Sequence, residues 1–308
     1  KIRFTGIGEP PDLDSLPPVS REGFDMSKYR QFPYSMGVES KRGCNFKCVY
    51  CLYPHLHGSH VLLRSPKRVV DDIEKLVCEH GIRHFFFTDP IFNFPPDHGL
   101  KICKGIIKRN RNAGAARRPW ADYMNAKFMV EAVKSGCDIF DFSPDGACDE
   151  AMKVLGKNME VRDIEKAIDL IHEMEGAKVG FNFMYDLPRA NMQQLLGFTR
   201  LFLRIMRTCG DKLQYLSLTR IRIYPHTSIY NIALSEGKID ENTDLISPVY
   251  YQSNSSQIQH YYTSLIGWLA WKHIRNTRWK WPASSGCKKS GRVNVGCRWI
   301  RFLLKTCL

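Results

Sequence analysis

Short apolar runs alternate with amphipathic segments along most of the chain. Segment 178–185 (KVGFNFMY) is rich in aromatic and β-branched residues, which is typical of a buried strand. Segment 66–80 repeats apolar residues at helical spacing and precedes Gly81, a residue suited to ending a helix. Because strand-like and helix-like segments follow one another in this regular order, the pattern predicts βα units arranged around a parallel sheet.

Six such units are predicted. Strands are expected at residues 36–40, 84–88, 120–124, 138–143, 178–185 and 214–224. Helices are expected at residues 66–80, 100–109, 126–135, 148–155, 163–175 and 192–206. Six units over about 190 residues indicate an α/β fold, a partial (β/α)6 TIM-type barrel that is open on one side. The working groups of such barrels lie at the C-terminal ends of the strands, where this chain places Asp89, Asn125, Ser143 and Asp186.

The segments that flank the barrel pattern have a different character. Residues 1–36 carry two Pro-Pro pairs and little periodicity, and the chain begins with Lys, not Met. We therefore predict an extended linker that follows a missing N-terminal domain. Residues 37–235 form the predicted barrel, and residues 236–275 a helical C-terminal extension. Residues 276–308 mix Trp, Cys, Gly and basic residues without period, so we interpret them as an atypical basic tail outside the catalytic unit.

Composition and charge narrow the class of protein. With 308 residues, 44% of them hydrophobic, the chain can bury one sizeable core or two smaller ones. Its longest apolar stretch, residues 261–271, is about half of the roughly 20 residues that a membrane span needs, so no membrane partner is expected. The net charge of +14 is concentrated at one end, because residues 275–308 hold nine Lys or Arg and no acidic residue. Such a tail can contact RNA, but it carries +9 of the +14 and leaves +5 for the other 274 residues, which is ordinary for a soluble enzyme, so a nucleic-acid partner is not favoured.

Three cysteines, Cys44, Cys48 and Cys51, fall within eight residues. Closely spaced thiolates are the ligands that zinc and iron–sulfur clusters take, and this set is one ligand short of four. A zinc site completed by His55, His57 or His60 is one interpretation. A disulfide is less favoured, because no signal peptide precedes the motif and the total of eleven cysteines is odd.

The spacing Cys-x3-Cys-x2-Cys, with Tyr50 just before the last cysteine, resembles the cluster loop of the radical S-adenosylmethionine (SAM) superfamily. The resemblance covers residues 37 to about 235 and implies a partial barrel of radical SAM type. It implies that the three cysteines hold a [4Fe–4S] cluster and that SAM chelates the fourth iron. The implied activity is reductive cleavage of SAM to a 5′-deoxyadenosyl radical.

The resemblance also suggests residues that bind the cofactor. Tyr50 matches an aromatic residue near the adenine, and Asp89 stands where many members carry Gly-Gly-Glu, so it is expected to accept from the SAM amino group. Ser143 and Asp145 follow the fourth strand, where members place polar groups for the ribose or carboxylate. The remaining expected residues are Asn182, Asp186 and Tyr224. Lys157, by contrast, is interpreted as a solvated surface charge.

Residues 222–230 resemble a signature of the subgroup that many cobalamin-dependent members share, and residues 13–18 and 64–66 fit that subgroup too. This implies a cobalamin bound by a domain outside the chain, and methylation or a related modification of an unactivated carbon. The expected partners are a small-molecule or peptide substrate and an electron donor such as flavodoxin or ferredoxin. An exposed cluster and further thiols need a reducing compartment, so a cytoplasmic location is expected.

Other functions remain open at this stage. The cysteine and histidine loop and the basic tail also fit a zinc-stabilised RNA-binding protein. Other members of the superfamily modify tRNA by methylthiolation, and no residue in the chain identifies the substrate. The missing Gly-Gly-Glu is compatible with a non-catalytic barrel that serves as an interaction module.

Overall fold

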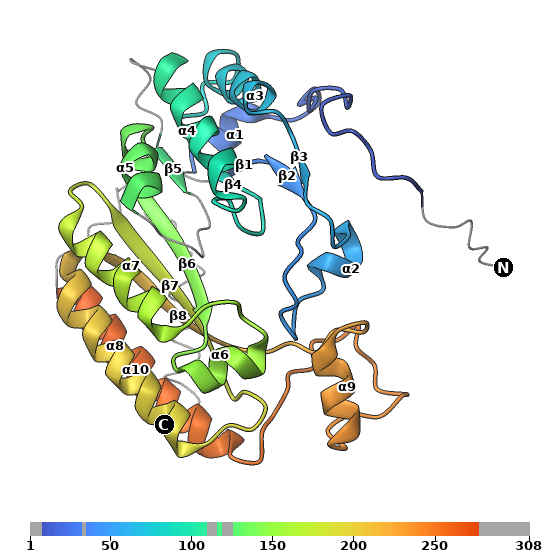
Figure 1. Cartoon of the computed structure of the whole chain (residues 1–308), viewed down its shortest axis with the longest axis vertical. Helices are drawn as coiled ribbons and strands as arrows, with labels where there is room; N and C mark the ends of the chain where they lie inside the picture. The colour runs from blue at the N-terminus through green and yellow to red at the C-terminus, as the bar shows by residue number, and fades with distance from the viewer. Residues whose placement is uncertain (1–7, 33–34, 110–115, 119–125, 277–308) are drawn as a thin grey trace.

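The computed structural model describes residues 8–32, 35–109, 116–118 and 126–276 of the chain. Figure 1 shows parallel strands with helices packed along their outer side. The elements in chain order are α1 (Met26–Arg30), β1 (Met36–Val38), β2 (Lys41–Arg42), α2 (Tyr53–His57), β3 (Leu62–Leu63), α3 (Pro66–Cys78), β4 (His84–Phe87), α4 (Pro96–Arg109), β5 (Ala116–Arg118), α5 (Ala126–Lys134), β6 (Ile139–Asp145), α6 (Asp149–Leu155), α7 (Val161–Glu173), β7 (Lys178–Tyr185), α8 (Met192–Cys209), η1 (Gly210–Lys212), β8 (Leu213–Arg220), α9 (Ser228–Ser235) and α10 (Ser256–Asn276).

Six parallel strands form the barrel. Strands β1, β4 and β5 pair in that order, and strands β6, β7 and β8 form a second parallel group. Strand β5 lies against β6, so the strands follow one another around the barrel in chain order. The predicted α/β fold, a partial TIM-type barrel, is therefore confirmed. Strands β2 and β3 stand apart as an antiparallel hairpin.

The core lies between the strands and the outer helices. On β7, Val179, Phe181 and Phe183 are almost fully buried against α7 and α8. The ring of Phe183 meets that of Phe198 on α8 edge-on, with 5.4 Å between their centroids. Because side chains alternate along a strand, Asn182 projects from the opposite, inner face of β7, and Gly180 lies on that face without a side chain.

Most predicted elements match within a few residues. Segment 178–185 is β7 as predicted, and the helix predicted at 66–80 ends at Cys78. The strand predicted at 214–224 was too long, because β8 ends at Arg220. Beyond it the backbone pairs with residues 249–251, which supply its hydrogen bonds: the amide of Ile223 donates to Val249 at 2.8 Å. The strand predicted at 120–124, with Asn125, lies outside the described residues, and β5 precedes it.

The C-terminal part of the described chain returns to the barrel. Helix α10 packs against β8 and α8, where the Tyr262 and Thr199 hydroxyls are hydrogen-bonded to each other. Figure 1 shows α8 and α10 side by side on the outer surface. Among the described helices, none combines the length and the apolar character that crossing a bilayer requires.

Candidate active site

The three cysteines lie on a loop that leaves and re-enters the β2–β3 hairpin. At the base of this loop, residues 43–61, the amide of Cys44 donates to the carbonyl oxygen of Gly58 at 3.2 Å. Gly43 has a φ of +81°, and a Cβ built on it would lie 1.9 Å from the carbonyl oxygen of His60. The two ends of the loop therefore approach so closely that only glycine fits at position 43.

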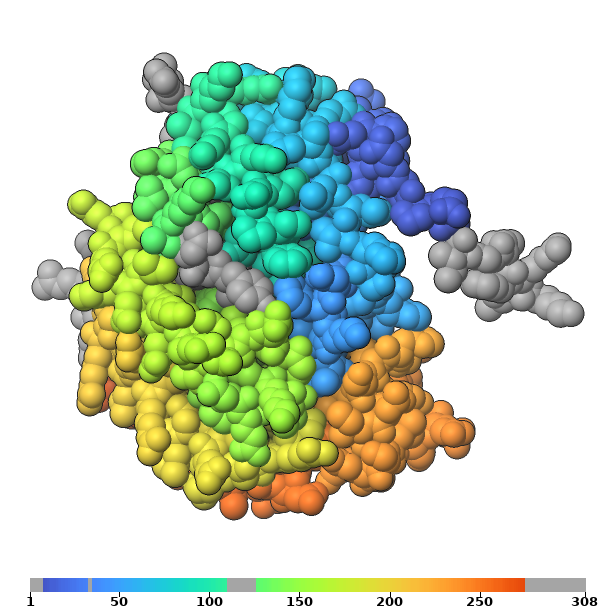
Figure 2. All heavy atoms as spheres, viewed as in Figure 1, coloured from blue at the N-terminus to red at the C-terminus, as the bar shows by residue number. Residues whose placement is uncertain are grey.

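The middle of the loop is attached to two other parts of the barrel. The amide of Val49 donates to the carbonyl oxygen of Leu155 at 3.0 Å, and the Val49 carbonyl accepts from the amide of Ile229 at 2.9 Å. Gly156, at a φ of +68°, lets the end of α6 approach the carbonyl oxygen of Lys47, which would lie 2.6 Å from a Cβ. Figure 2 shows the blue region of the chain that contains the loop directly against the orange region that contains α9.

The three cysteines of the loop are partly exposed, and none of them forms a disulfide. Burial raises the pKa of the Cys51 thiol, while the Tyr53 amide and the Lys157 ammonium oppose that shift. No three His, Cys, Asp or Glu side chains in the described part of the chain converge closely enough to hold one metal ion. A [4Fe–4S] cluster binds each thiolate through a different iron, so its ligands need not converge on one point. Three cysteines on one anchored loop, none of them in a disulfide, therefore fit a cluster.

Behind the loop lies a buried ion pair that the sequence did not indicate. The Lys157 ammonium lies 2.9 Å from the Asp145 carboxylate, and both side chains are less than 10% exposed (7% and 6%). Lys157 also donates to the Ser143 carbonyl oxygen at 2.8 Å, and the Tyr50 hydroxyl donates to Asp145. The interpretation of Lys157 as a solvated surface charge was wrong, because two acceptors at the end of β6 hold its ammonium inside the protein.

A row of polar side chains crosses the inner face of the sheet. The Asn182 amide donates to the Ser143 hydroxyl at 3.2 Å and to the Tyr215 hydroxyl at 3.3 Å. The Tyr215 hydroxyl in turn donates to Asp141. The Tyr215 ring lies over Gly180, where a Cβ would come within 2.1 Å of a ring carbon. These hydroxyl and amide groups extend the polar surface that begins at the Lys157–Asp145 pair.

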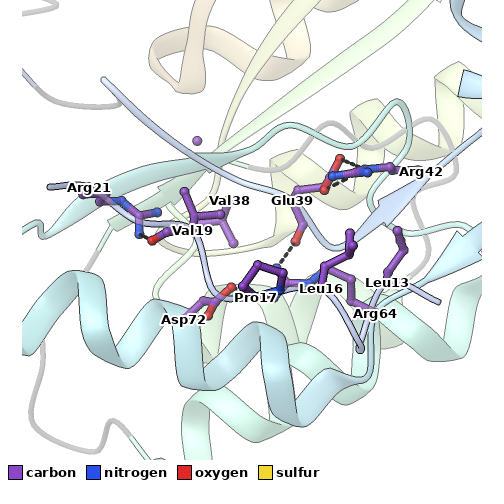
Figure 3. Close-up of a pocket in the computed structure, with 11 residues that line it drawn as sticks. Leu13, Leu16, Pro17, Val19, Arg21, Val38, Glu39, Arg42, Arg64 and Asp72 are labelled. Atoms are coloured by element: carbon purple, nitrogen blue, oxygen red, sulfur yellow. Dashed lines mark hydrogen bonds and ion pairs between the residues drawn. The ribbon is translucent and has the colours of Figure 1, made fainter. Parts of the chain in front are cut away.

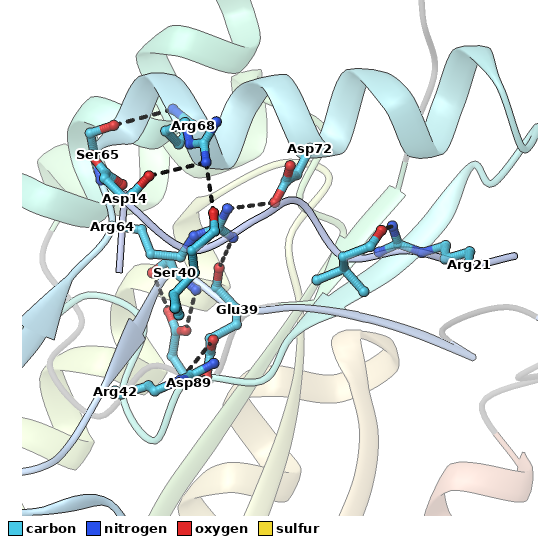
Figure 4. A network of polar contacts seen from close by, with 12 residues as sticks. Asp14, Arg21, Glu39, Ser40, Arg42, Arg64, Ser65, Arg68, Asp72 and Asp89 are labelled. Carbon is cyan, nitrogen blue, oxygen red and sulfur yellow. Dashed lines mark hydrogen bonds and ion pairs between the residues drawn. The ribbon is translucent and has the colours of Figure 1, made fainter. Parts of the chain in front are cut away.

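Asp89 lies at the predicted strand end but faces the backbone of the hairpin. Its carboxylate accepts from the Ser40 amide at 2.7 Å, from the Lys41 amide at 3.2 Å and from the Ser40 hydroxyl. The side chain is buried, and burial raises the pKa of Asp89 while the Lys41 ammonium opposes the shift. Figure 4 shows Asp89 and Ser40 together with the polar network of Asp14, Arg64, Ser65, Arg68 and Asp72. Its contact with SAM stays a prediction.

Two other predicted residues are engaged elsewhere. Asp186, which is 1% exposed, accepts from the Ser253 amide at 2.9 Å and from the Ser256 hydroxyl, and so holds the start of α10. The ring of Tyr224 lies 4.7 Å from the Arg222 guanidinium. The structure thus brings Tyr50 of the cysteine loop together with Ser143, Asp145 and Asn182, which lie behind that loop. It gives Asp186 and Tyr224 other contacts, and their roles toward a cofactor stay predictions.

The proline-rich N-terminal segment packs on the barrel beside this site. The Ser65 amide donates to the Asp14 carboxylate at 2.8 Å, and Arg68 donates to the Leu16 carbonyl oxygen at 2.9 Å. Figure 3 shows a small cavity between residues 13–21 and β1, with Arg64 and Asp72 at its floor, 2.6 Å apart. Residues 13–21, predicted as part of a linker, therefore lie in contact with β1 and α3.

An anchored loop with three cysteines at the strand ends of a partial βα barrel is the arrangement that the sequence resemblance predicted. The family model "Radical SAM superfamily" matches residues 38–202, which is more than half of the chain. The chain belongs to the radical SAM superfamily, as the cysteine spacing predicted.

Relatives and solved structures agree with this membership. An uncharacterized methyltransferase of Pyrococcus horikoshii is 22% identical over 238 residues, which cover 74% of this chain and 49% of that protein. The tryptophan 2-C-methyltransferase of Streptomyces laurentii is 26% identical over 59% of this chain and 31% of its own length. The radical SAM methyltransferase TsrM of Kitasatospora setae, solved with cobalamin and a [4Fe–4S] cluster, shares the fold, with a TM-score of 0.62 and 18% identity over 71% of this chain and 40% of that one. The chain spans about half or less of the length of these relatives.

Proposed function

We propose that this chain is the barrel of a cobalamin-dependent radical SAM methyltransferase. Cys44, Cys48 and Cys51 hold a [4Fe–4S] cluster, SAM binds its open iron, and the enzyme methylates or otherwise modifies an unactivated carbon. The observation that carries the proposal is the loop with three closely spaced cysteines outside any disulfide, anchored through Val49 to the end of α6 and the start of α9. When bound, cluster and SAM supply the one-electron cleavage of a carbon–sulfur bond.

The part of the chain's own residues is to hold and orient the cluster and SAM. Val49 fixes the position of the cysteine loop relative to the barrel through its two backbone hydrogen bonds, to Leu155 and Ile229. Tyr50 is held by Asp145, which the Lys157 ammonium keeps in place. The Ser143 hydroxyl and Asn182 amide offer hydrogen bonds to a polar cofactor from the inner face of the sheet. Such preorganised dipoles need no rearrangement when the cofactor reacts.

The finer parts of the proposal draw on the relatives. Two curated relatives are named as methyltransferases, and a solved structure with this fold contains cobalamin. We infer a small-molecule or peptide substrate, a cobalamin held outside the described residues, and an electron donor of the flavodoxin or ferredoxin type. A partly exposed cluster loop also favours a reducing compartment such as the cytoplasm.

The test is anaerobic purification and reconstitution with iron and sulfide, followed by measurement of iron, visible absorbance and SAM cleavage with dithionite. Wild type should bind about four irons per chain and cleave SAM, as expected for one [4Fe–4S] cluster. Cys44→Ala should lose both, whereas Cys78→Ala, which changes an exposed thiol outside the loop, should keep both. Bound zinc without iron would favour the zinc-stabilised alternative. Iron without SAM cleavage would favour the interaction module.

The methyltransferase part needs a separate measurement. Reconstituted protein is incubated with cobalamin and SAM that carries a labelled methyl group, and the label on cobalamin and on candidate acceptors is followed. Transfer that depends on cobalamin supports the proposal. Cleavage of SAM that cobalamin does not change would contradict this part and leave the superfamily assignment intact.

A further inference from the structure

Lys41 is a fully buried lysine at the base of the cysteine loop. It is the first residue of β2 and lies three positions before Cys44. The side chain is 1% exposed, and its ammonium donates to the carbonyl oxygens of Ile91 at 3.0 Å, Phe92 at 2.8 Å and Phe94 at 2.6 Å. All three protons of the ammonium therefore find acceptors in the loop between β4 and α4.

These three acceptors are neutral, so the positive charge is not cancelled by hydrogen bonding. Burial lowers the pKa of Lys41 to about 8, and the nearby Asp89 and Cys44 oppose the shift. The ammonium also lies 5.8 Å from the centroid of the Phe92 ring. A lysine is rarely buried at this cost unless its charge or its hydrogen bonds are needed.

Lys41 and Cys44 line the same small cavity. Its other walls come from the start of the cysteine loop and from the loop after β4, including Pro90, Ile91 and Phe94. The ring of Phe46, which follows Cys44 in this loop, packs against Phe94 with 5.1 Å between centroids. The ammonium thus sits where the cysteine loop meets the β4–α4 loop.

We propose that Lys41 is a positioning residue for the cluster: it ties the β4–α4 loop to the base of the cysteine loop and places a buried positive charge beside Cys44. This inference rests on the proposed function. Reduction of a cluster by an external one-electron donor adds one negative charge, and a nearby cation in a medium of low dielectric constant stabilises that state. Lys41 therefore makes the cluster easier to reduce.

The test compares Lys41→Gln and Lys41→Met with Lys41→Arg in anaerobically reconstituted protein. The cluster is titrated with dithionite at set potentials, and its reduced form is followed by electron paramagnetic resonance. In the two neutral variants the ratio of reduced to oxidised cluster at a fixed potential should fall about tenfold, which equals about 59 mV for one electron. Lys41→Arg keeps the charge and should stay near the wild-type ratio.

Lys212 provides a matched control. Its ammonium also donates to three carbonyl oxygens, those of Ile171 at 2.8 Å, His172 at 2.7 Å and Met174 at 2.8 Å. It lies just before the start of β8, at the opposite end of the strands from the cysteine loop. Lys212→Met therefore also removes three hydrogen bonds from an ammonium to carbonyl oxygens, but far from the cysteine loop, and should leave the reduction potential unchanged.

The outcomes are distinguishable. Neutral variants that lose iron while Lys41→Arg and Lys212→Met retain it would support the positioning role directly. Neutral variants that bind iron with a wild-type potential would overturn the inference about Lys41 and leave the proposed function standing. If wild type itself binds no iron, the proposed function fails and this inference fails with it.

Discussion

The Lys157 ammonium and the Asp145 carboxylate, 2.9 Å apart, join the end of α6 to the end of β6 directly behind the cysteine loop. Asp145 also accepts from Tyr50, whose neighbours in sequence include Cys48 and Cys51. One buried ion pair thus connects two elements of the barrel with the loop that we propose holds the cluster. Loss of this ion pair should lower both the stability of the fold and the iron content of the reconstituted protein.

Lys157→Met should lower the free energy of unfolding by about 3–5 kcal/mol, because it leaves a buried carboxylate without its counter-charge. The measurement is equilibrium unfolding in urea of the iron-free protein. In reconstituted protein, the iron content should fall as well, since Tyr50 loses a fixed partner.

Arg204→Ala is the matched control for this change. Arg204 pairs with Asp169 at 2.9 Å on the outer surface, where its side chain is 40% exposed. Its removal should cost only about 0–1 kcal/mol, because water screens an exposed pair. Adding Asp145→Asn to Lys157→Met should restore part of the lost stability. If the double variant is no more stable than Lys157→Met, charge burial is not the cause of the loss.

The sequence predicted most of the barrel because its strands and helices carry strong local patterns. Segment 178–185 is a continuous run rich in aromatic and β-branched residues, which include the buried Val179, Phe181 and Phe183, so both the existence and the length of β7 followed from the sequence. The end of β8 could not be predicted in the same way. Whether residues 221–223 extend the barrel strand or leave it depends on residues 249–251, which lie far along the chain and compete for the same hydrogen bonds.

The three cysteines of the candidate site could be found from the sequence, whereas most of the side chains that support their loop could not. The spacing of the three cysteines is a local signal and needs no fold to be seen. The burial of Lys41 and Lys157 is decided by acceptors that only the folded chain brings near, and lysine is exposed in most local contexts. Asp89 shows the intermediate case. Its place at a strand end was predicted, but the hairpin backbone that occupies its carboxylate was not.

Gly43→Ala should disrupt the cysteine loop. A methyl group at this position would lie 1.9 Å from the His60 carbonyl oxygen, and the backbone at a φ of +81° already disfavours a side chain. We expect reconstituted Gly43→Ala to hold less than half of the wild-type iron, measured by colorimetric assay. Its free energy of unfolding should fall by more than the roughly 1 kcal/mol that alanine costs at a positive φ alone.

Gly237→Ala distinguishes the effect of backbone strain at a positive φ from the effect of the steric overlap with His60. Gly237 also has a positive φ, +63°, but a Cβ at this position would meet nothing within 4 Å, and the residue follows α9, away from the loop base. This variant should lose only the stability that the strained backbone costs and should bind iron as wild type does. Equal iron loss in both variants would show that the close approach at Gly43 is not what shapes the loop.

Cys209 should resist alkylation far beyond neutral pH. It is 1% exposed, and burial raises the pKa of its thiol to about 12. Because the thiolate is the reactive form, roughly one molecule in a thousand is reactive at pH 9, and the rate should rise about tenfold per pH unit toward pH 12. Peptide mass spectrometry after timed iodoacetamide treatment measures this rate. In urea the same thiol should react at pH 9 with an ordinary rate, and similar rates in folded and unfolded protein would contradict the prediction.

Asp186→Asn distinguishes a structural role from a cofactor-binding role. In the structure the Asp186 carboxylate accepts from the Ser253 amide and the Ser256 hydroxyl, so it holds the first turn of α10. An asparagine keeps one acceptor and loses the other, and the Ser256 hydroxyl then meets a donor. We expect a loss of about 1–3 kcal/mol in unfolding free energy, as for a buried hydrogen bond left unmade. Hydrogen exchange should become faster in residues 253–263, and the affinity of the reconstituted protein for SAM, measured by equilibrium dialysis, should stay within about twofold.

Asn182→Ala is the comparison for Asp186→Asn. Because Asn182 faces the inner side of the sheet beside Ser143, its replacement should weaken SAM binding without changing hydrogen exchange in α10. If Asp186→Asn instead weakens SAM binding as strongly as Asn182→Ala while α10 stays protected, Asp186 contacts the cofactor, and its bonds to the serines are secondary.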